Sequence, residues 1–597
     1  MYRKILISLF SALFLFTPLI LTSFTSEMFE IPKMLFVYFI TGLIVAAYII
    51  YIIIHKKRIQ FGAGHFLLLL FVVSQLLSWA FSIDKHTSMF GYYGRFNGGF
   101  LSTLVFAALM FISSQIFDKR IFSILINVSI VASIFVLLWG LPGRFFGVDM
   151  SCVYFRWDFS TSCWTNEFRP AERMFSTLGQ PNWLGAFFSL HFFYGLYMAW
   201  QRYSEKLQKQ KLILYAYIAY SILMLWSVTL TGSRSSLLGI LLPTVVELLI
   251  YLYRKLNKRI FIGTVTIFAV LVLAITTYYA ISIYQQNDPN GITHSGKIRL
   301  IVWEGAIKLA TKYPLFGTGP ETFAYSYYLT RPDAHNYTSE KDFIYNKAHN
   351  EVLNMLATTG FVGLTAYLLL FGFVVYSLLR MYLTQRIVAY MLISIFTLNF
   401  FGFSTSTSQI ALYTLMGYGF YEIYSNKMSW SKKLEVQKLN KFILSSISSI
   451  VVLSLLLYLA FLRNYLVGDI LYAQSQAYFE SSSPVKAITN CMDAVNTKFE
   501  HIYADRCASM SAATASLLKD AESEELVDYR KSLISLANTF SAIALSSSPQ
   551  NPIYIRSRIK VINILMTLDK SKDYKQEKIK LNALYRKLAP TDHQKFD

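Results

Sequence analysis

Cysteine and acidic residues are scarce in this chain of 597 residues. It has four cysteines, and its 34 Asp and Glu stand against 55 Lys and Arg, which gives a net charge of +21. Charged residues make up 15% of the sequence and hydrophobic residues 54%, and the mean hydropathy is +0.42. This composition is too apolar for a soluble protein of this size and is typical of a polytopic membrane protein.

Several chemical motifs are also missing. The sequence has no Walker phosphate-binding loop, no HExxH zinc motif and no His, Cys and Asp set with metal-ligand spacing, so we expect neither a metal nor a cofactor. Charge is nearly absent from the apolar segments, which disfavours ion-coupled transport, because such transporters need ionisable groups inside the membrane. The basic residues flank apolar segments, and we therefore expect the partner to be a membrane and not a nucleic acid.

Apolar segments of about 20 residues, long enough to cross a bilayer, recur along residues 1–462. We predict an all-α fold with about thirteen transmembrane helices in this membrane domain. Their expected ranges are 5–25, 34–54, 65–83, 98–117, 121–141, 183–200, 212–230, 235–253, 260–283, 352–379, 387–403, 408–424 and 442–462. The first resembles a signal peptide, but no small-residue cleavage site follows it, so we expect it to be retained.

The basic residues lie in alternate connecting segments. With a cytoplasmic N-terminus, the segments on that side hold 22 Lys and Arg against three acidic residues. These segments are 2–4, 55–58, 118–120, 201–211, 254–259, 380–386 and 425–441. The positive-inside rule then predicts a multi-pass protein of the cytoplasmic (inner) membrane with a cytoplasmic N-terminus and an extracytoplasmic C-terminus.

The four cysteines agree with that topology, because all of them fall in expected outside segments. Disulfides persist in oxidising compartments, and the spacing favours two local pairs, Cys152 with Cys163 and Cys491 with Cys507. Four unrelated free thiols are the alternative.

Residues 463–597 form a second, extracytoplasmic domain of soluble composition. We expect five or six helices with breaks near residues 481–484, 546–552, 570–573 and 590. Alanine and proline punctuation near a 35-residue period resembles tetratricopeptide repeats, though weakly.

The longest polar interruption of the membrane domain is an outside loop at about 284–351. Within it, residues 297–312 have the apolar spacing of a helix lying near the interface, and Pro314 ends that helix before the Gly317–Pro320 turn. The loop closes on an Ala-His-Asn-Glu cluster, residues 348–351, next to an apolar segment. A polar and aromatic loop in this position is where a membrane enzyme would keep its chemistry.

Three arginines, Arg173, Arg234 and Arg299, lie near the expected outer membrane boundary. Arginine is always charged and offers a planar fork of donors that matches phosphate. Near hydrocarbon it is unfavourable unless an anion meets it, so several together indicate an anionic group such as a polyprenyl diphosphate. The alternative is ordinary interfacial arginines that reach water or pair with acidic residues.

His349 lies on the same boundary, directly before an expected helix. An imidazole titrates near neutral pH and can accept a proton from an incoming hydroxyl, although a lone histidine is more often structural or solvated. Glu351, His335 and Arg95 are further candidates.

Four segments in order resemble the O-antigen ligase and polymerase superfamily: RMFSTLGQPNWLG (173–185), LTGSRSSLLG (230–239), the long segment 298–323 and AHNEVLNMLATTGFVGL (348–364). The resemblance covers the first twelve spans. It implies a metal-independent, inverting glycosyltransferase whose donor is an undecaprenyl-diphosphate-linked glycan. It also implies an essential histidine at His349, in a His-Asn-x-x-Leu setting, and essential arginines at Arg299 and Arg234, with Arg173 a further donor-binding candidate.

The acceptor stays open at this point, because the thirteenth span and the helical tail depart from the family pattern. We expect transfer of the glycan to a hydroxyl on a glycan, lipid or protein at the outer face of the membrane, as in lipopolysaccharide assembly. A polymerase of lipid-linked repeats and a protein O-oligosaccharyltransferase are the enzyme alternatives. A lipid-linked glycan transporter or an envelope scaffold is the non-enzyme alternative.

Overall fold

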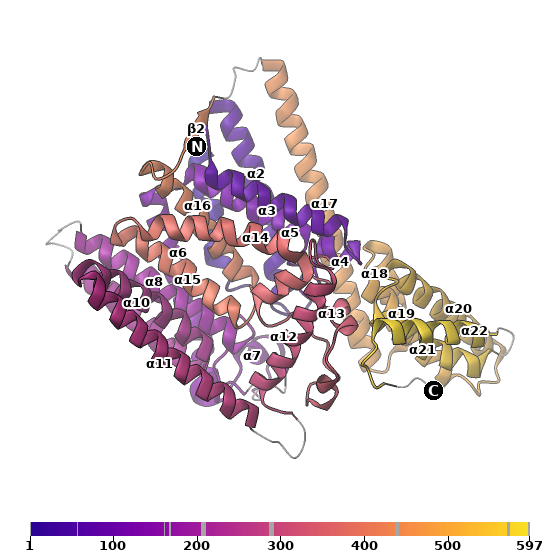
Figure 1. Ribbon diagram of the computed structural model, residues 1–597. Helices are drawn as coiled ribbons and strands as arrows, with labels where there is room; N and C mark the ends of the chain where they lie inside the picture. The colour runs from indigo at the N-terminus through magenta and orange to yellow at the C-terminus, as the bar shows by residue number, and fades with distance from the viewer. Residues whose placement is uncertain are drawn as a thin grey trace.

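The computed structural model describes residues 2–55, 58–159, 162–165, 169–204, 211–285, 292–435, 441–569 and 573–594. The protein is an all-α polytopic membrane protein, as predicted. Each of the thirteen expected spans overlaps a helix (Figure 1), although the first helix ends at Phe16 and the expected span 5–25 is helical only in its first part. These are α1 (Tyr2–Phe16), α2 (Glu30–His55), α3 (Ala63–Ala80), α5 (Phe100–Ile116), α6 (Lys119–Phe146), α8 (Pro181–Ser204), α9 (Lys211–Leu230), α10 (Arg234–Lys255), α11 (Lys258–Gln285), α14 (Glu351–Leu379), α15 (Leu383–Phe400), α16 (Ser406–Ser425) and α17 (Lys441–Glu480).

Eight of these helices are long and apolar enough to cross a membrane, counting only the described residues. Short helices occupy the loops and bring the site residues into place. These are α4 (Lys85–Phe90), α7 (Met150–Arg156), α12 (Ser295–Lys312), α13 (Phe323–Ser326) and the 3-10 turns η2 (Tyr327–Leu329) and η3 (Asp333–Tyr337).

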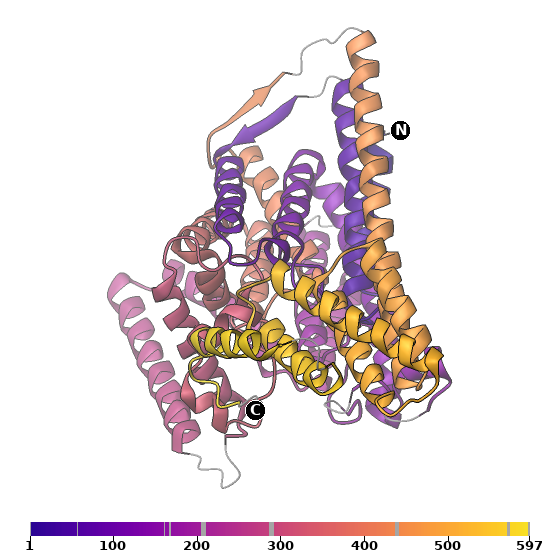
Figure 2. The ribbon, with the colours of Figure 1, turned by 90° about the vertical axis from the view of Figure 1, so that its right-hand side faces the viewer.

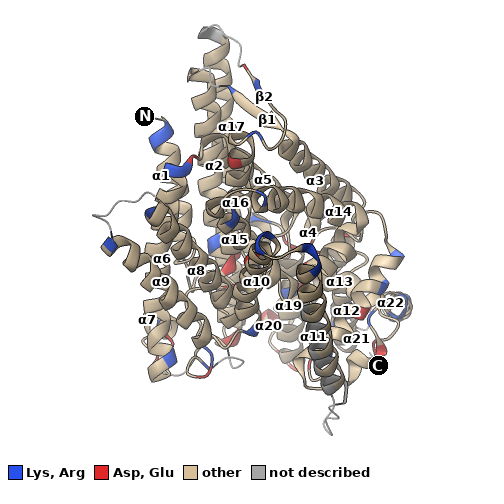
Figure 3. Cartoon of the chain, turned by 60° about the vertical axis from the view of Figure 1, so that its left-hand side comes forward, with Lys and Arg blue, Asp and Glu red and all other residues tan. Residues whose placement is uncertain are grey.

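Segments with expected cytoplasmic positions meet at one end of the bundle. Strand β1 (Ile59–Gly62) pairs antiparallel with β2 (Ser431–Leu434), and Arg3 forms an ion pair with Asp118 at 2.6 Å. Figure 3 shows basic residues, in blue, on α1 and β2 at this end. Much of the expected cytoplasmic segment 201–211, and residues 436–440, lie outside the described residues.

The tail lies at the opposite end of the molecule from β1 and β2 (Figure 2). It consists of the end of α17 and of α18 (Pro484–Thr497), α19 (His501–Leu517), α20 (Glu524–Ser547), α21 (Pro552–Leu568) and α22 (Lys575–Leu588). Two of its helices begin with proline, which lacks the amide proton that a first helical turn leaves unpaired. The tetratricopeptide likeness and the boundary at residue 462 stay predictions, and α17 crosses that boundary as one continuous helix.

Disulfide bonds join Cys152 to Cys163 and Cys491 to Cys507, the pairs expected from the sequence. The second bond links α18 to α19, and the first closes the loop that follows α6.

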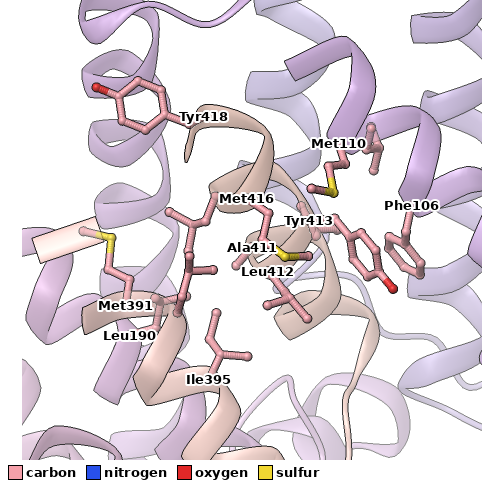
Figure 4. Close-up of a cluster of buried hydrophobic side chains, with 14 of the residues drawn as sticks. Phe106, Met110, Leu190, Met391, Ile395, Ala411, Leu412, Tyr413, Met416 and Tyr418 are labelled. Atoms are coloured by element: carbon pink, nitrogen blue, oxygen red, sulfur yellow. The ribbon is translucent and has the colours of Figure 1, made fainter. Parts of the chain in front are cut away.

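Helix α16 lies at the centre of the bundle. Figure 4 shows Tyr413 and Met416 of α16 against Phe106 of α5, with Leu190 of α8 and Ile395 of α15 on another side. The Tyr413 and Phe106 rings stack with 5.3 Å between centroids. Most residues of α16 are buried, as expected for a helix that other helices enclose.

One expected span is not a continuous helix. We predicted residues 352–379 as uninterrupted, but α14 breaks at Gly360, where φ is +68°. The Gly317–Pro320 turn inserts there: the Thr318 and Gly319 amides donate to carbonyls of Ala357 and Thr358 at 3.2 and 2.8 Å. A Cβ on Gly360 would lie 2.3 Å from the Leu315 carbonyl oxygen, so only glycine fits.

The tail is attached to the loops of the membrane domain through polar contacts. Asp469 on α17 accepts hydrogen bonds from the Ser26 amide and hydroxyl at 2.9 and 2.6 Å. The Ser548 hydroxyl donates to Asp84 at 2.6 Å. The second contact joins the tail to the N-cap residue of α4, in the segment that leads to Arg95.

Candidate functional site

A cavity at the tail end of the bundle contains two of the four predicted site residues, Arg299 and His349. Its empty space, including the part open to solvent, is about 1070 Å³. The cavity is amphipathic, because both apolar and polar side chains line it. The apolar lining includes Phe14, Phe187, Leu190, Leu398 and Ile410, and the polar lining includes Gln180, Asn182, Thr405 and Ser408.

His349 is held in an unusual backbone conformation. Its φ is +52°, in the left-handed region that non-glycine residues rarely adopt. Hydrogen bonds fix the chain on both sides: the Trp303 indole donates to the Ala348 carbonyl at 3.1 Å, and Asn350 caps α14 by accepting from the Leu353 amide at 3.0 Å. The surrounding structure thus fixes this strained residue, and such strain clusters at functional sites.

The charge state of His349 is set by its surroundings. Burial, and then the positive charges of Arg299 and Arg95, lower the pKa of this imidazole to about 4. Its ring makes edge contacts with Tyr345 and Phe403, at centroid distances of 5.7 and 5.4 Å. At neutral pH the imidazole is therefore uncharged and can accept a proton.

Arg299 projects from α12 into the same cavity. Helix α12 spans Ser295–Lys312 and ends before Pro314, as the sequence predicted. One guanidinium nitrogen of Arg299 donates to the Phe401 carbonyl at 3.3 Å. Burial lowers the pKa of Arg299, but a guanidinium remains charged at neutral pH. The cavity thus contains a half-buried positive charge that an anionic ligand would neutralise.

The structure places Arg173 beside this cavity and not in its lining. Its guanidinium donates to the Asn182 side chain at 2.9 Å and to the Thr231 carbonyl at 3.2 Å. Burial, and then the charge of Arg299, lower the pKa of Arg173, so the two guanidiniums interact. Asn182 lines the cavity and connects Arg173 to it.

Arg234 is the first residue of α10 and is exposed. It does not line the cavity, although its neighbour Ser235 does.

Two other candidates, Arg95 and Glu351, line a second, polar cavity. There Lys347 forms an ion pair with Glu321, and both side chains are buried. Arg95 also contacts the wall of the first cavity, since its guanidinium lies 4.1 Å from the ring centroid of Phe403, a residue of that cavity.

His335 lies away from both cavities. It is fully buried, and its Nδ1 lies 3.0 Å from the Tyr327 hydroxyl in a hydrogen bond. The Tyr345 ring contacts His335 on one side and His349 on the other, at 5.3 and 5.7 Å. This position fits a role in packing the loop.

The sequence did not single out Asn182, Trp183 or Phe403. Asn182 and Trp183 follow Pro181 in one of the motifs, and their place at the start of a helix was the available signal. Phe403 had no signal beyond its place in a short loop. Across the described residues, no group of three His, Cys, Asp or Glu side chains could hold a metal ion.

The fold and the cavity define a multi-pass membrane protein with an amphipathic cavity at one end of its helices. Residues 219–368, about a quarter of the chain, match the family model described as O-antigen ligase. This region contains Arg234, Arg299 and His349, and the match supports the likeness of the chain to the O-antigen ligase and polymerase superfamily. No curated protein sequence matches the chain.

Proposed function

We propose that this protein transfers a glycan from a polyprenyl-diphosphate carrier to an acceptor hydroxyl at the outer face of the cytoplasmic membrane. The observation that carries the proposal is the amphipathic cavity that holds Arg299 and His349. Its apolar lining suits a lipid chain, and its arginine suits a diphosphate. A binding site for a lipid-linked sugar needs both in one cavity.

The diphosphate of the donor would contact Arg299, and Arg173 through the Asn182 side of the cavity. The guanidinium fork binds phosphate oxygens in pairs and stabilises the negative charge that develops when the glycan leaves. Because the two guanidiniums repel each other, an anion between them would also remove an unfavourable interaction.

His349 would act as the general base. Its neutral imidazole removes the proton of the acceptor hydroxyl while that oxygen attacks the anomeric carbon. The bond from this carbon to the carrier's phosphate oxygen breaks, and the diphosphate leaves with the electron pair. Attack from the face opposite the leaving group inverts the anomeric configuration, without a metal in this scheme.

Donor binding would also change the pKa of His349. Arg299 is one of the charges that lower the pKa of His349. A bound diphosphate would offset that charge, raise this pKa and make the imidazole a stronger base once the donor is in place.

The three acceptor classes differ in their products. A ligase gives one transfer to a different glycan or lipid, a polymerase gives a ladder of lipid-linked repeats, and an oligosaccharyltransferase modifies protein. Mass analysis of the product in membranes separates these alternatives.

Binding of undecaprenyl diphosphate to the purified protein in nanodiscs tests the donor site. Arg299→Lys should weaken binding about tenfold or more, because an ammonium cannot form the paired contacts and a hydrogen bond to a charged group contributes about 1.5–3 kcal/mol. The control is Arg169→Lys, since Arg169 is exposed and its partner Glu172 is exposed as well. Equal affinity in the wild type and Arg299→Lys would contradict the proposed donor site.

A further inference from the structure

A third cavity lies between the tail and the membrane domain. Helices α19 and α21 form its tail side, and the loops that contain Tyr92 and Tyr325 form its membrane-domain side. Its empty space, with the part open to solvent, is about 810 Å³. This interdomain cleft belongs to neither of the cavities that contain the predicted site residues.

Tyrosine rings dominate the interdomain cleft. Tyr92 lies 5.2 Å from Tyr93 and 6.5 Å from Tyr325, between ring centroids, and Tyr325 lies 6.4 Å from Tyr554 of the tail. The rings thus form a continuous aromatic wall that crosses from one domain to the other. Aromatic rings with polar hydroxyls suit ligands that have both apolar faces and hydroxyl groups, and the C–H face of a sugar ring is such a surface.

The charges of the interdomain cleft come from the tail. Arg506, Arg556 and Lys560 line it together with one acidic residue, Asp505. Arg556 and Lys560 are four residues apart and share one face of α21. Arg506 and Lys560 are exposed. The net positive charge favours ligands that carry carboxylate or phosphate groups.

The cleft and the polar cavity that contains Arg95 share two loops. Tyr92 and Tyr93 line the cleft, whereas Arg95 lines the polar cavity two residues later. The Arg95 amide donates to the Tyr92 carbonyl at 2.9 Å, which fixes this turn. In the second loop, Glu321 lines the polar cavity and Tyr325 lines the cleft. A chain in the cleft would therefore lie one loop away from the residues around His349.

We propose that the interdomain cleft binds an acidic saccharide chain, one or more sugar residues beyond the reacting end. This inference rests on the proposed glycan transfer and adds a second contact with a substrate. The chain is either the glycan of the donor or that of the acceptor, since both would reach the outer face. The tail thereby holds the saccharide near the site and is not merely attached to the enzyme.

Binding of a defined saccharide tests this without any transfer reaction. The probe is a galacturonic acid hexasaccharide, compared with neutral maltohexaose, titrated into the full-length protein in nanodiscs. We expect the acidic probe to bind more tightly and to lose affinity as salt rises, because charge contacts are screened. Lys560→Glu and Arg506→Ala should each weaken binding about tenfold, since each removes a hydrogen bond to a charged group.

Lys531→Ala is the matched control, because Lys531 is exposed on α20 and pairs with Asp528. His349→Ala should bind the acidic hexasaccharide as the wild type does, so loss of transfer and loss of saccharide binding are separable results. Equal binding in Lys560→Glu and the wild type, or no preference for the acidic probe, would overturn the proposal. Tighter binding of a poly-glutamate peptide than of the hexasaccharide would overturn it in favour of an acidic protein partner.

Transfer kinetics then identify the source of the saccharide. A rise of KM for the donor in Lys560→Glu, with KM for the acceptor unchanged, assigns the cleft to the donor glycan, and the reverse assigns it to the acceptor. Wild-type values of both constants would count against the proposal.

Discussion

The guanidinium of Arg95 lies 4.1 Å from the centroid of the Phe403 ring. The same ring makes an edge contact with the His349 imidazole at 5.4 Å. Trp183 flanks Arg95 on another side, with 5.7 Å between the guanidinium carbon and the ring centroid. A cation over an aromatic face is attractive, so this stack connects the loop under the tail to the predicted catalytic base.

Phe403→Leu tests whether this stack positions His349. The substitution removes the aromatic face but keeps an apolar side chain, and it should lower kcat about twofold to thirtyfold, the effect of losing about 0.5–2 kcal/mol of cation–π energy. KM for the donor should change less, because Phe403 is assigned no contact with the diphosphate. Unchanged kcat in a properly folded variant would remove Phe403 from the account.

The buried ion pair between Lys347 and Glu321 predicts a thermodynamic coupling. Both residues are buried, with relative side-chain exposures of 9% and 3%. Lys347→Met should destabilise the protein by about 3–5 kcal/mol, because the Glu321 charge then lacks its partner. The double variant Lys347→Met/Glu321→Leu should recover most of that loss. Thermal unfolding of the two single variants and the double variant measures the coupling, and purely additive losses would argue against it.

The lowered pKa of His349 predicts the pH dependence of transfer. The base must be neutral, and burial with two nearby arginines lowers its pKa to about 4. The ratio kcat/KM, which reports the free enzyme, should therefore stay level from about pH 8 to about pH 5.5 and fall only as pH approaches 4. Arg95→Gln removes one of the charges and should move this fall to higher pH. A decline centred at the ordinary histidine pKa in the wild type would contradict the proposed environment.

The disulfides and the basic segments predict one topology. Reporter fusions after Trp430, in the loop before β2, should report the cytoplasm, and fusions after Gln550, in the tail, should report the outside. Mass mapping without reductant should recover the Cys491–Cys507 link. A cytoplasmic signal at residue 550 would remove both the thirteenth span and the extracytoplasmic tail.

The helical framework could be predicted because long apolar segments and flanking basic residues are local features of the chain. The end of α12 before Pro314 follows from the same kind of local rule. The break of α14 at Gly360 could not be predicted, because it depends on a turn more than 40 residues earlier that supplies hydrogen-bond partners. A glycine inside an apolar segment has no local sign of such a partner.

The site could be predicted only in part, because local motifs identify single residues but not the contacts between distant loops. Arg299 and His349 belong to recognisable motifs, and the structure brings them into one cavity. The contact of His349 with Phe403 and its position near Arg95 depend on loops that are far apart in sequence. These loops meet through the packing of α5, α14 and α16. Arg234 is exposed at the start of α10 and outside the cavity lining, and its predicted contact with the donor stays a prediction.

Single-turnover transfer tests the central claim most directly. Purified wild type, His349→Ala and the control His593→Ala are mixed with a synthetic undecaprenyl-diphosphate oligosaccharide and with membranes that supply the acceptor. His593 is a suitable control because it is exposed and pairs with Asp333 on the surface. Loss of a general base typically costs about 10²–10⁴-fold, so His349→Ala should lose at least about a hundredfold in rate at saturating donor while retaining donor binding. Transfer by His349→Ala at the rate of His593→Ala would contradict the account.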